Sequence, residues 1–279
     1  MHQRPGRVAL LAVLLAVATT TAAADAGGQN DAGTGADAGN ARGSATTVAI
    51  GAQYLGNKLR VDDVDWYAAE VPGPAASCVR AVVSVNAPTY FALGAESGAT
   101  KVGVPFRASP GSTTSAGVAG VSPLTATLRA AQTPGVEGQS KYDFRLELVE
   151  ATGGGGDAGL IGDAGDSAGT ATLVEPGCVK GALTGIDIRD TFAIDVPAGD
   201  SLTYSLASAS SAVRVALTDA LGNTVGPSIA PGESARVAVS APGTYYMSAS
   251  QTTSFGDAAY VIGAVSGPEP TGCRPYCME

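Results

Sequence analysis

Apolar and polar residues alternate with a period of two in the clearest segments of this chain. In residues 142–148, with the sequence YDFRLEL, aromatic or aliphatic side chains take turns with charged ones. Successive side chains of a strand point to opposite faces of the sheet. The segment therefore predicts a half-buried β-strand with Tyr142, Phe144, Leu146 and Leu148 facing a core.

Similar short runs recur along the chain and are separated by residues that favour tight turns. Pro-Ala-Gly-Asp at 197–200 and Ala-Pro-Gly-Thr at 241–244 are two such turns, because Pro fixes φ and Gly accepts a positive φ. Strands at this spacing predict an antiparallel sandwich or barrel. Residues 94–123, rich in Gly, Ser and Thr, are predicted to form a long loop insertion. The predicted strands are 65–71, 79–85, 90–93, 124–128 and 142–149 in the first half, and 178–183, 191–196, 201–206, 213–217, 235–239, 244–249 and 259–265 in the second.

The chain also contains an internal repeat. Segment 31–48 recurs as 157–174, an offset of 126, and segment 56–72 recurs as 181–197, an offset of 125 after one deletion. A period of this size indicates two domains rather than a solenoid of small repeats. We therefore predict an all-β chain with two tandem antiparallel β-sandwich domains.

The repeat and the composition together set the predicted domain boundaries. Each unit opens with a segment rich in Gly, Asp and Ala that shows no apolar periodicity, which favours a linker or loop. The predicted segments are an export signal at 1–24, a Gly/Asp-rich linker at 25–43, a first module at 44–149, a second Gly/Asp-rich linker at 150–169, a second module at 170–266 and a Cys-containing tail at 267–279.

The export signal is predicted from the first two dozen residues. Arg4 and Arg7 form a positive region, residues 8–18 are an uninterrupted apolar run, and 22–24 are small residues suited to cleavage. The apolar run is shorter than the roughly 20 residues of a membrane span, and no other stretch of the sequence is apolar for long enough. We expect a secreted or cell-surface-associated protein without a membrane span in the mature chain.

Charge and histidine content exclude several classes of function. Removing residues 1–24 takes away two of the 16 basic residues and no acid, so the mature chain has a net charge of 14 − 25 = −11. This charge disfavours nucleic acid and anionic membranes as partners and favours cations. The single histidine, His2, lies in the predicted signal. The mature chain therefore lacks the imidazole that Ser-His-Asp and Cys-His catalysis and histidine metal sites require.

Four cysteines form an even set in a chain predicted to be exported, which favours disulfides. Cys273 and Cys277 are expected to hold the tail, either by pairing with each other or by one of them reaching Cys178, and all three connectivities with Cys78 stay open. A four-cysteine zinc site is the alternative, but its only closely spaced pair is C-x3-C at the end of the chain.

Carboxylates are the remaining candidates for chemistry. Asp63 and Asp65 lie two residues apart and share a strand face, while Trp66 is predicted on the opposite face, in the core. Like charges this close repel unless a cation or backbone N–H groups compensate them, and a hard cation such as calcium accepts carboxylate oxygens. The alternative is a solvated strand entrance.

The openings of the two units repeat a second set of acids. Asp31 and Asp37 recur as Asp157 and Asp163, and Asn40 recurs as Asp166. Oxygens on a glycine-rich backbone are suited to wrap an ion, although a flexible acidic linker has the same composition. The candidate metal ligands are Asp31, Asp37, Asp63, Asp65, Asp157, Asp163, Asp166 and Asp190.

The sequence resembles the bacterial and archaeal pre-peptidase C-terminal domain over nearly all of 44–149 and 170–266. The resemblance rests on Asp-Val-Asp-Trp-Tyr at 63–67, on Val-Pro-Ala-Gly at 196–199 and on Pro-Gly-Thr-Tyr-Tyr at 242–246. It implies a jelly-roll-like β-sandwich that is secreted, usually appended to a peptidase or another exported enzyme. Related collagen-binding modules bind calcium and substrate fibres, so the resemblance implies calcium as the candidate cofactor here.

Three functions follow from these observations. The first is a secreted, non-catalytic binding or accessory protein that acts on an extracellular polymer, a cell surface or a secreted partner protein. The second is a structural subunit of a surface layer or filament, assembled through sheet edges. The third is a hydrolase that uses carboxylates such as Asp63 and Asp65, disfavoured because few aromatic residues are present to line a sugar cleft.

Overall fold

The computed structural model describes residues 31–58, 64–72, 76–97, 100–121, 123–132, 139–151, 157, 163–252 and 257–268. These residues form seventeen strands and two short 3-10 helices, η1 (Asp31–Gly33) and η2 (Arg42–Ser44). Within these ranges there is no helix with the length and apolar character of a membrane span. The predicted export signal at 1–24, Cys273 and Cys277 lie outside the described residues.

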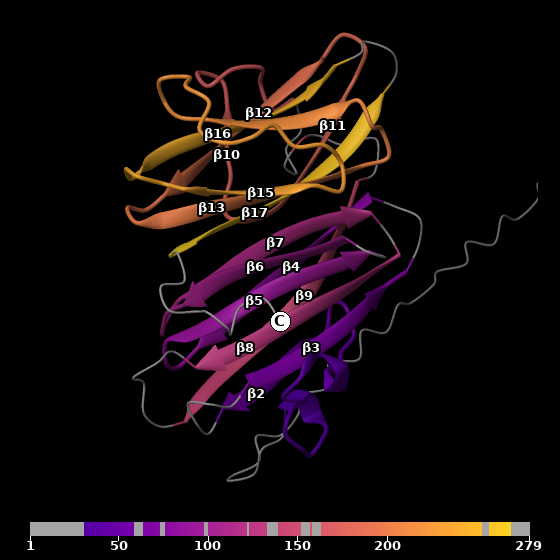
Figure 1. Ribbon diagram of the computed structural model, residues 1–279, viewed down its shortest axis with the longest axis vertical. Helices are drawn as coiled ribbons and strands as arrows, with labels where there is room; N and C mark the ends of the chain where they lie inside the picture. Colours follow the sequence, from indigo (N-terminus) through magenta and orange to yellow (C-terminus); the bar gives the residue numbers. More distant parts are fainter. Residues whose placement is uncertain are drawn as a thin grey trace, which may run out of the picture.

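The first module is a sandwich of two sheets (Figure 1). Its outer sheet has the strand order β1-β3-β8-β5-β6 and its inner sheet the order β2-β9-β4-β7. All neighbouring strands pair antiparallel except β1, which runs parallel to β3. The strands are β1 (Thr46–Thr47), β2 (Gln53–Lys58), β3 (Val64–Val71), β4 (Ala76–Val85), β5 (Thr89–Ser97), β6 (Thr100–Ala108), β7 (Thr113–Val121), β8 (Leu124–Gln132) and β9 (Ser140–Glu150).

The second module repeats this topology, except that no named strand of its outer sheet corresponds to β6. Its outer sheet has the order β10-β12-β16-β14, again opened by a short parallel pair, and its inner sheet the order β11-β17-β13-β15. The strands are β10 (Thr172–Leu173), β11 (Gly177–Leu183), β12 (Arg189–Val196), β13 (Asp200–Ser208), β14 (Val213–Thr218), β15 (Ser234–Ala238), β16 (Gly243–Gln251) and β17 (Ala258–Pro268). The predicted all-β antiparallel fold is confirmed.

Each module has its own aromatic and aliphatic core between its two sheets. In the first, Tyr67 and Phe144 pack with ring centroids 4.4 Å apart, and Phe91 stacks on Phe106 at 5.4 Å. In the second, the fully buried aromatic side chains include Phe192 and Tyr260. The alternation that predicted the strands thus places one face of each strand in a core.

Residues 94–123, predicted as a loop insertion, form the end of β5 and the strands β6 and β7. The prediction was wrong because composition hid the alternation: Val104, Phe106 and Ala108 are all buried, with exposed or half-buried residues between them. Gly, Ser and Thr predominate in β7 because both of its faces are covered, one by its own core and the other by the second module.

The described parts of the two predicted linkers pack against the sandwiches. Ala38 and Ala164 are 2% and 1% exposed and belong to the cores of the first and second modules. Gly39 and Gly165 then make backbone hydrogen bonds to the strands β3 and β12, through Trp66 and Thr191 respectively. The described part of each segment is therefore packed against the module that follows it.

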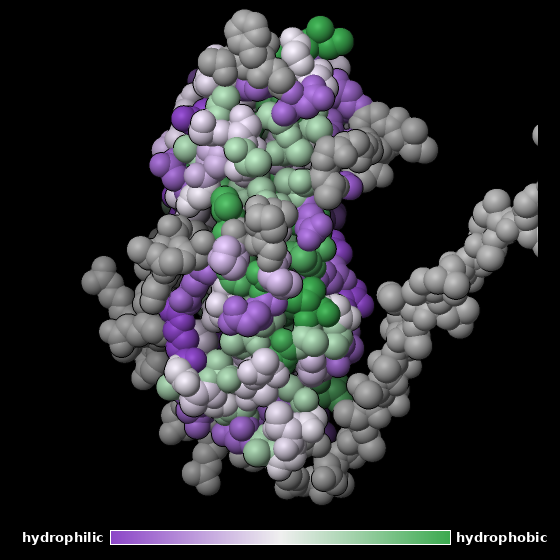
Figure 2. Space-filling view, turned by 90° about the vertical axis from the view of Figure 1, so that its right-hand side faces the viewer, coloured by the Kyte–Doolittle hydropathy of each residue, from purple (hydrophilic) through white to green (hydrophobic). Residues whose placement is uncertain are grey.

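The inner sheets of the two modules face each other, so the molecule is four sheets deep (Figure 1). The buried centre of the contact is formed mainly by small and aliphatic residues, among them Ala119 of β7, Ala207 of β13 and Val261 of β17. The N–H of Ala119 donates to the Ser205 hydroxyl at 2.9 Å. In the view of Figure 2 the more apolar surface residues extend from the middle of the molecule down over the first module.

Glycine permits the closest approach across the junction. A Cβ atom added to Gly117 would lie 2.2 Å from the carbonyl oxygen of Gly177, and one added to Gly263 would lie 2.6 Å from the carbonyl oxygen of Gly117. These neighbours are backbone atoms, which cannot rotate away as a side chain can. The glycines thus allow the two backbones to touch.

A disulfide between Cys78 of β4 and Cys178 of β11 joins the two inner sheets, with a Cα–Cα distance of 5.8 Å. The alternative in which a tail cysteine reaches Cys178 is therefore wrong, and so is the zinc site built from all four cysteines. Sequence spacing contained no sign of this pair because its two members belong to different modules, 100 residues apart.

Substituting Gly117 by Ala is expected to lower the free energy of unfolding by about 1–3 kcal/mol, the usual cost of overpacking. Gly103→Ala in β6 is the matched control, because its added Cβ meets nothing within 4 Å, and its effect is expected to stay within about 0.5 kcal/mol. Urea unfolding of both variants measures the difference. Equal midpoints for the two variants would contradict backbone contact at the junction.

Replacing Cys78 and Cys178 together by Ser is expected to destabilise the protein by about 2–5 kcal/mol, because the crosslink closes a loop of 100 residues in the unfolded chain. The double variant removes both sulfurs and leaves no unpaired thiol at the junction. Its denaturant midpoint should match that of the reduced wild-type protein. A wild-type midpoint unchanged by reduction would contradict this prediction.

Candidate metal centre

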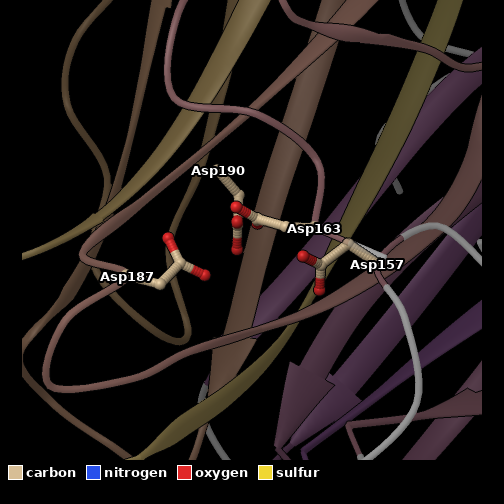
Figure 3. Close-up of side chains that lie close together, drawn as sticks. All are labelled: Asp157, Asp163, Asp187 and Asp190. Atoms are coloured by element: carbon tan, nitrogen blue, oxygen red, sulfur yellow. The ribbon is translucent and has the colours of Figure 1, made fainter. Parts of the chain in front are cut away.

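The structure brings acids of each module together in one cluster. Asp31, Asp37 and Asp65 form the first cluster, and Asp157, Asp163, Asp187 and Asp190 form the second. In each cluster every residue offers one carboxylate oxygen, and these oxygens all lie within 4.8 Å of one another. Figure 3 shows the four carboxylates of the second cluster converging from a strand and two loops.

The first acid of each cluster ties the opening segment to the sandwich. Asp31 accepts hydrogen bonds from the N–H of Ala38 at 3.0 Å and of Asn57 at 2.6 Å. Asp157 repeats this pattern with the N–H groups of Ala164, at 3.2 Å, and Ala182, at 2.9 Å. Both acids are almost fully buried. The glycine-rich opening therefore closes the edge of the sandwich between β2 and β3, or between β11 and β12.

A buried tyrosine orients the strand acid of each cluster. The Tyr142 hydroxyl donates to Asp65 and contacts the Tyr67 hydroxyl at 2.8 Å. In the second module the Tyr260 hydroxyl donates to Asp190 Oδ2 at 2.5 Å. The tyrosine rings lie over Gly56 and Gly181, where any side chain would overlap them. These pairs fix the direction in which Asp65 and Asp190 point.

The second cluster holds more negative charge than its surroundings compensate. Asp190 is 0% exposed, and its Oδ1 atom has no hydrogen-bond partner. Burial, together with the charges of Asp157 and Asp187, raises the pKa of Asp190 to about 8. Burial and the neighbouring Asp163 raise the pKa of Asp187 to about 6. Besides burial, repulsion between the carboxylates causes both shifts, and a bound cation would offset that repulsion.

The first cluster contains a cation of its own. Lys58, at the end of β2, is fully buried, and its Nζ lies 3.8 Å from Asp65 Oδ1. Burial is the main cause that raises the pKa of Asp31 to about 6, against the two backbone hydrogen bonds that lower it.

Six of the eight predicted ligands lie in the two clusters. Asp166 is exposed and lies outside the second cluster, and Asp63 lies outside the described residues. Asp187 is a further member of the second cluster that was not predicted, although the repeat offset of 125 aligns it with Asp62. That correspondence could have identified Asp187 as a candidate ligand, since Asp62 lies beside Asp63 and near Asp65 in the sequence.

Trp66 is not in the core as predicted. Asp65 and Tyr67 point inward from β3, and Trp66 is half-buried on the outer face, where the Arg129 guanidinium lies 5.7 Å from the ring centroid. The prediction failed because it assigned the acid to the solvent side of the strand. Here the acid is the inward residue because a tyrosine and a lysine accompany it.

No family model matches the sequence, and no curated protein matches it. Among solved structures, the PBSX exported protein XepA is 10% identical with a TM-score of 0.29, and the alignment covers 77% of this chain and 87% of that one. The tandem CBM22-1-CBM22-2 domain of Paenibacillus barcinonensis Xyn10C is 12% identical with a TM-score of 0.24, covering 76% and 87%. Tripeptidyl peptidase 2 is 8% identical with a TM-score of 0.27, covering 80% of this chain and 24% of its own. Likenesses this low carry no inference about function.

The metal-free protein is expected to lose stability as the pH rises from about 5 to about 8. Asp190 and Asp187 have a pKa in the native state above the ordinary value of 3.8, so the native state binds protons more tightly than the unfolded chain. That contribution is lost as the pH rises through about 6 and then about 8. Urea unfolding of chelator-treated protein measures the slope, and Asp190→Asn should flatten it. A free energy of unfolding that rises over this interval would contradict the prediction.

Proposed function

We propose that this protein is an exported, non-catalytic binding or accessory protein of two modules related to the pre-peptidase C-terminal domain, stabilised by bound calcium. The observation that supports it most directly is the buried Asp190 carboxylate. Its Oδ1 atom lacks a hydrogen-bond partner and lies among three further carboxylates. A buried charge in that position needs a compensating one.

The chemistry of the cluster favours a hard ion. Its four acids supply only carboxylate oxygens, which calcium accepts at six to eight positions and in flexible geometry. Zinc and copper prefer nitrogen or sulfur ligands, and the mature chain lacks histidine. Asp157, Asp163, Asp187 and Asp190 would hold the ion, with backbone carbonyls and water completing its shell.

The acids come from different segments of the fold, and this supports a structural role for the ion. Asp157 comes from the opening segment, Asp187 from the turn before β12 and Asp190 from β12 itself. An ion bound by all three would fix the opening segment and the turn to the strand. Asp65 and Asp190 are fully buried and accept hydrogen bonds from tyrosines, a poor situation for a hydrolytic acid that must reach a substrate.

Melting in calcium and in chelator tests this proposal. A ligand that binds only the native state adds about 2.7 kcal/mol at a hundredfold excess over Kd. For a cooperative unit of this size we expect calcium to raise the melting temperature by about 5–10 °C. Magnesium, which demands a more regular octahedral shell, should give a smaller rise.

Two variants make the melting test specific. Asp190→Asn should abolish the calcium response and raise the melting temperature in chelator, because it removes a repelling charge from the cluster. Asp195→Asn, on the same strand β12 but exposed, should keep the wild-type response. Identical melting curves for the wild type in calcium and in chelator would overturn the proposal.

A further inference from the structure

One buried position that differs between the two acid clusters changes the charge, whereas another, Tyr67 in the first module and Phe192 in the second, does not. Gly56 and Gly181 lie under the equivalent tyrosines, and the next residues, Asn57 and Ala182, donate their N–H groups to Asp31 and Asp157. The residue that follows is Lys58 in the first module and Leu183 in the second.

Strand pairing gives the same correspondence. Lys58 pairs with Ser140, two residues before Tyr142 on β9, and Leu183 pairs with Ala258, two residues before Tyr260 on β17. Lys58 and Leu183 therefore occupy the same position in the two folds.

Lys58 places an ammonium group inside the first module. Both Lys58 and Asp65 are 0% exposed, and 3.8 Å separates Nζ from Oδ1. A charged lysine is stable in such a place only when opposite charges surround it. The carboxylates of Asp31, Asp37 and Asp65, gathered within 4.8 Å of one another, supply that charge. The acids thus compensate the ammonium, and the ammonium offsets part of their charge.

Leu183 supplies no charge to the second module. It is 0% exposed and belongs to the hydrophobic core. Across the described part of the chain, none of the ion pairs formed by Lys or Arg includes Asp157, Asp163, Asp187 or Asp190. The Asp190 side chain points toward the other carboxylates (Figure 3), and its buried Oδ1 atom lacks a hydrogen-bond partner. The second cluster is therefore not compensated by a lysine or arginine of the described residues, which leaves a bound cation to supply the positive charge.

We infer that the two copies have diverged in the source of their positive charge. In the first module the Lys58 ammonium occupies the place of the ion, and only the second module binds a divalent cation. The protein then takes up one calcium ion per chain although it carries two acid clusters. This inference rests on the proposed function and adds to it the number and the position of the ions.

The two positions can be exchanged to test the inference. Calcium binding to the whole mature chain is measured by isothermal titration, starting from chelator-treated protein. We expect one ion for the wild type, none for Leu183→Lys and two for Lys58→Leu. Leu183→Met is the matched control, because it keeps an apolar side chain of similar volume and should still bind one ion.

Melting provides a second readout where Lys58→Leu is unstable. In chelator this variant should melt below the wild type, because it leaves the first cluster without a counter-charge, and calcium should recover the loss. Leu183→Lys should melt at the same temperature with and without calcium.

The outcomes separate this inference from the proposal on which it rests. A wild type that binds no calcium overturns the proposed function. A wild type that binds two ions, or a Lys58→Leu variant that still binds one, overturns the divergence inferred here while calcium binding stands. A Leu183→Lys variant that keeps one ion also overturns it.

Discussion

The edge of each sandwich depends on a buried aspartate at the start of the module. Asp31 and Asp157 each accept two backbone N–H groups, one from the opening segment and one from the strand β2 or β11. Charge-assisted bonds of this kind are stronger than those between neutral groups. They hold a segment whose composition would otherwise leave it unfolded, and they bring its second acid, Asp37 or Asp163, to the strand acid.

This arrangement concentrates negative charge around carboxylates that are partly withdrawn from water, Asp31, Asp65, Asp157 and Asp190 being buried. Each cluster therefore requires compensation, which the fold can provide through protons, a lysine or an ion. The raised pKa values of Asp187 and Asp190 correspond to compensation by protons, when neither a lysine nor an ion is present. In the divergence inferred above, the two copies meet this electrostatic requirement with different chemistry, through Lys58 on β2 and Leu183 on β11.

Much of the fold could be predicted from the sequence, because strand alternation and turn residues are local signals. The pattern in 142–148 predicted β9, and the repeat offset alone was enough to pair Asp65 with Asp190. The strands β6 and β7 could not be predicted in the same way. The residues of β7 are small because a second module covers them, and that contact is not local in sequence.

The candidate site could likewise be predicted from the sequence only in part. The repetition of Asp31 and Asp37 as Asp157 and Asp163 pointed to the openings of the modules. The inward direction of Asp65 could not be inferred, since a lone acid in a strand is normally placed toward solvent, and only the buried Tyr142 and Lys58 make the inward position favourable. The pairing of Cys78 with Cys178 depends on how the modules stack, which no spacing within one module encodes.

The disulfide between Cys78 and Cys178 determines what happens to the protein after a protease has cut it. Cys78 and Cys178 bracket most of the first module and the whole connection between the two. A protease that cuts the chain once between these cysteines leaves two pieces that are still covalently joined at the junction of the inner sheets. Scission there cannot release either module while the bond is oxidised, so a nicked molecule remains a single particle.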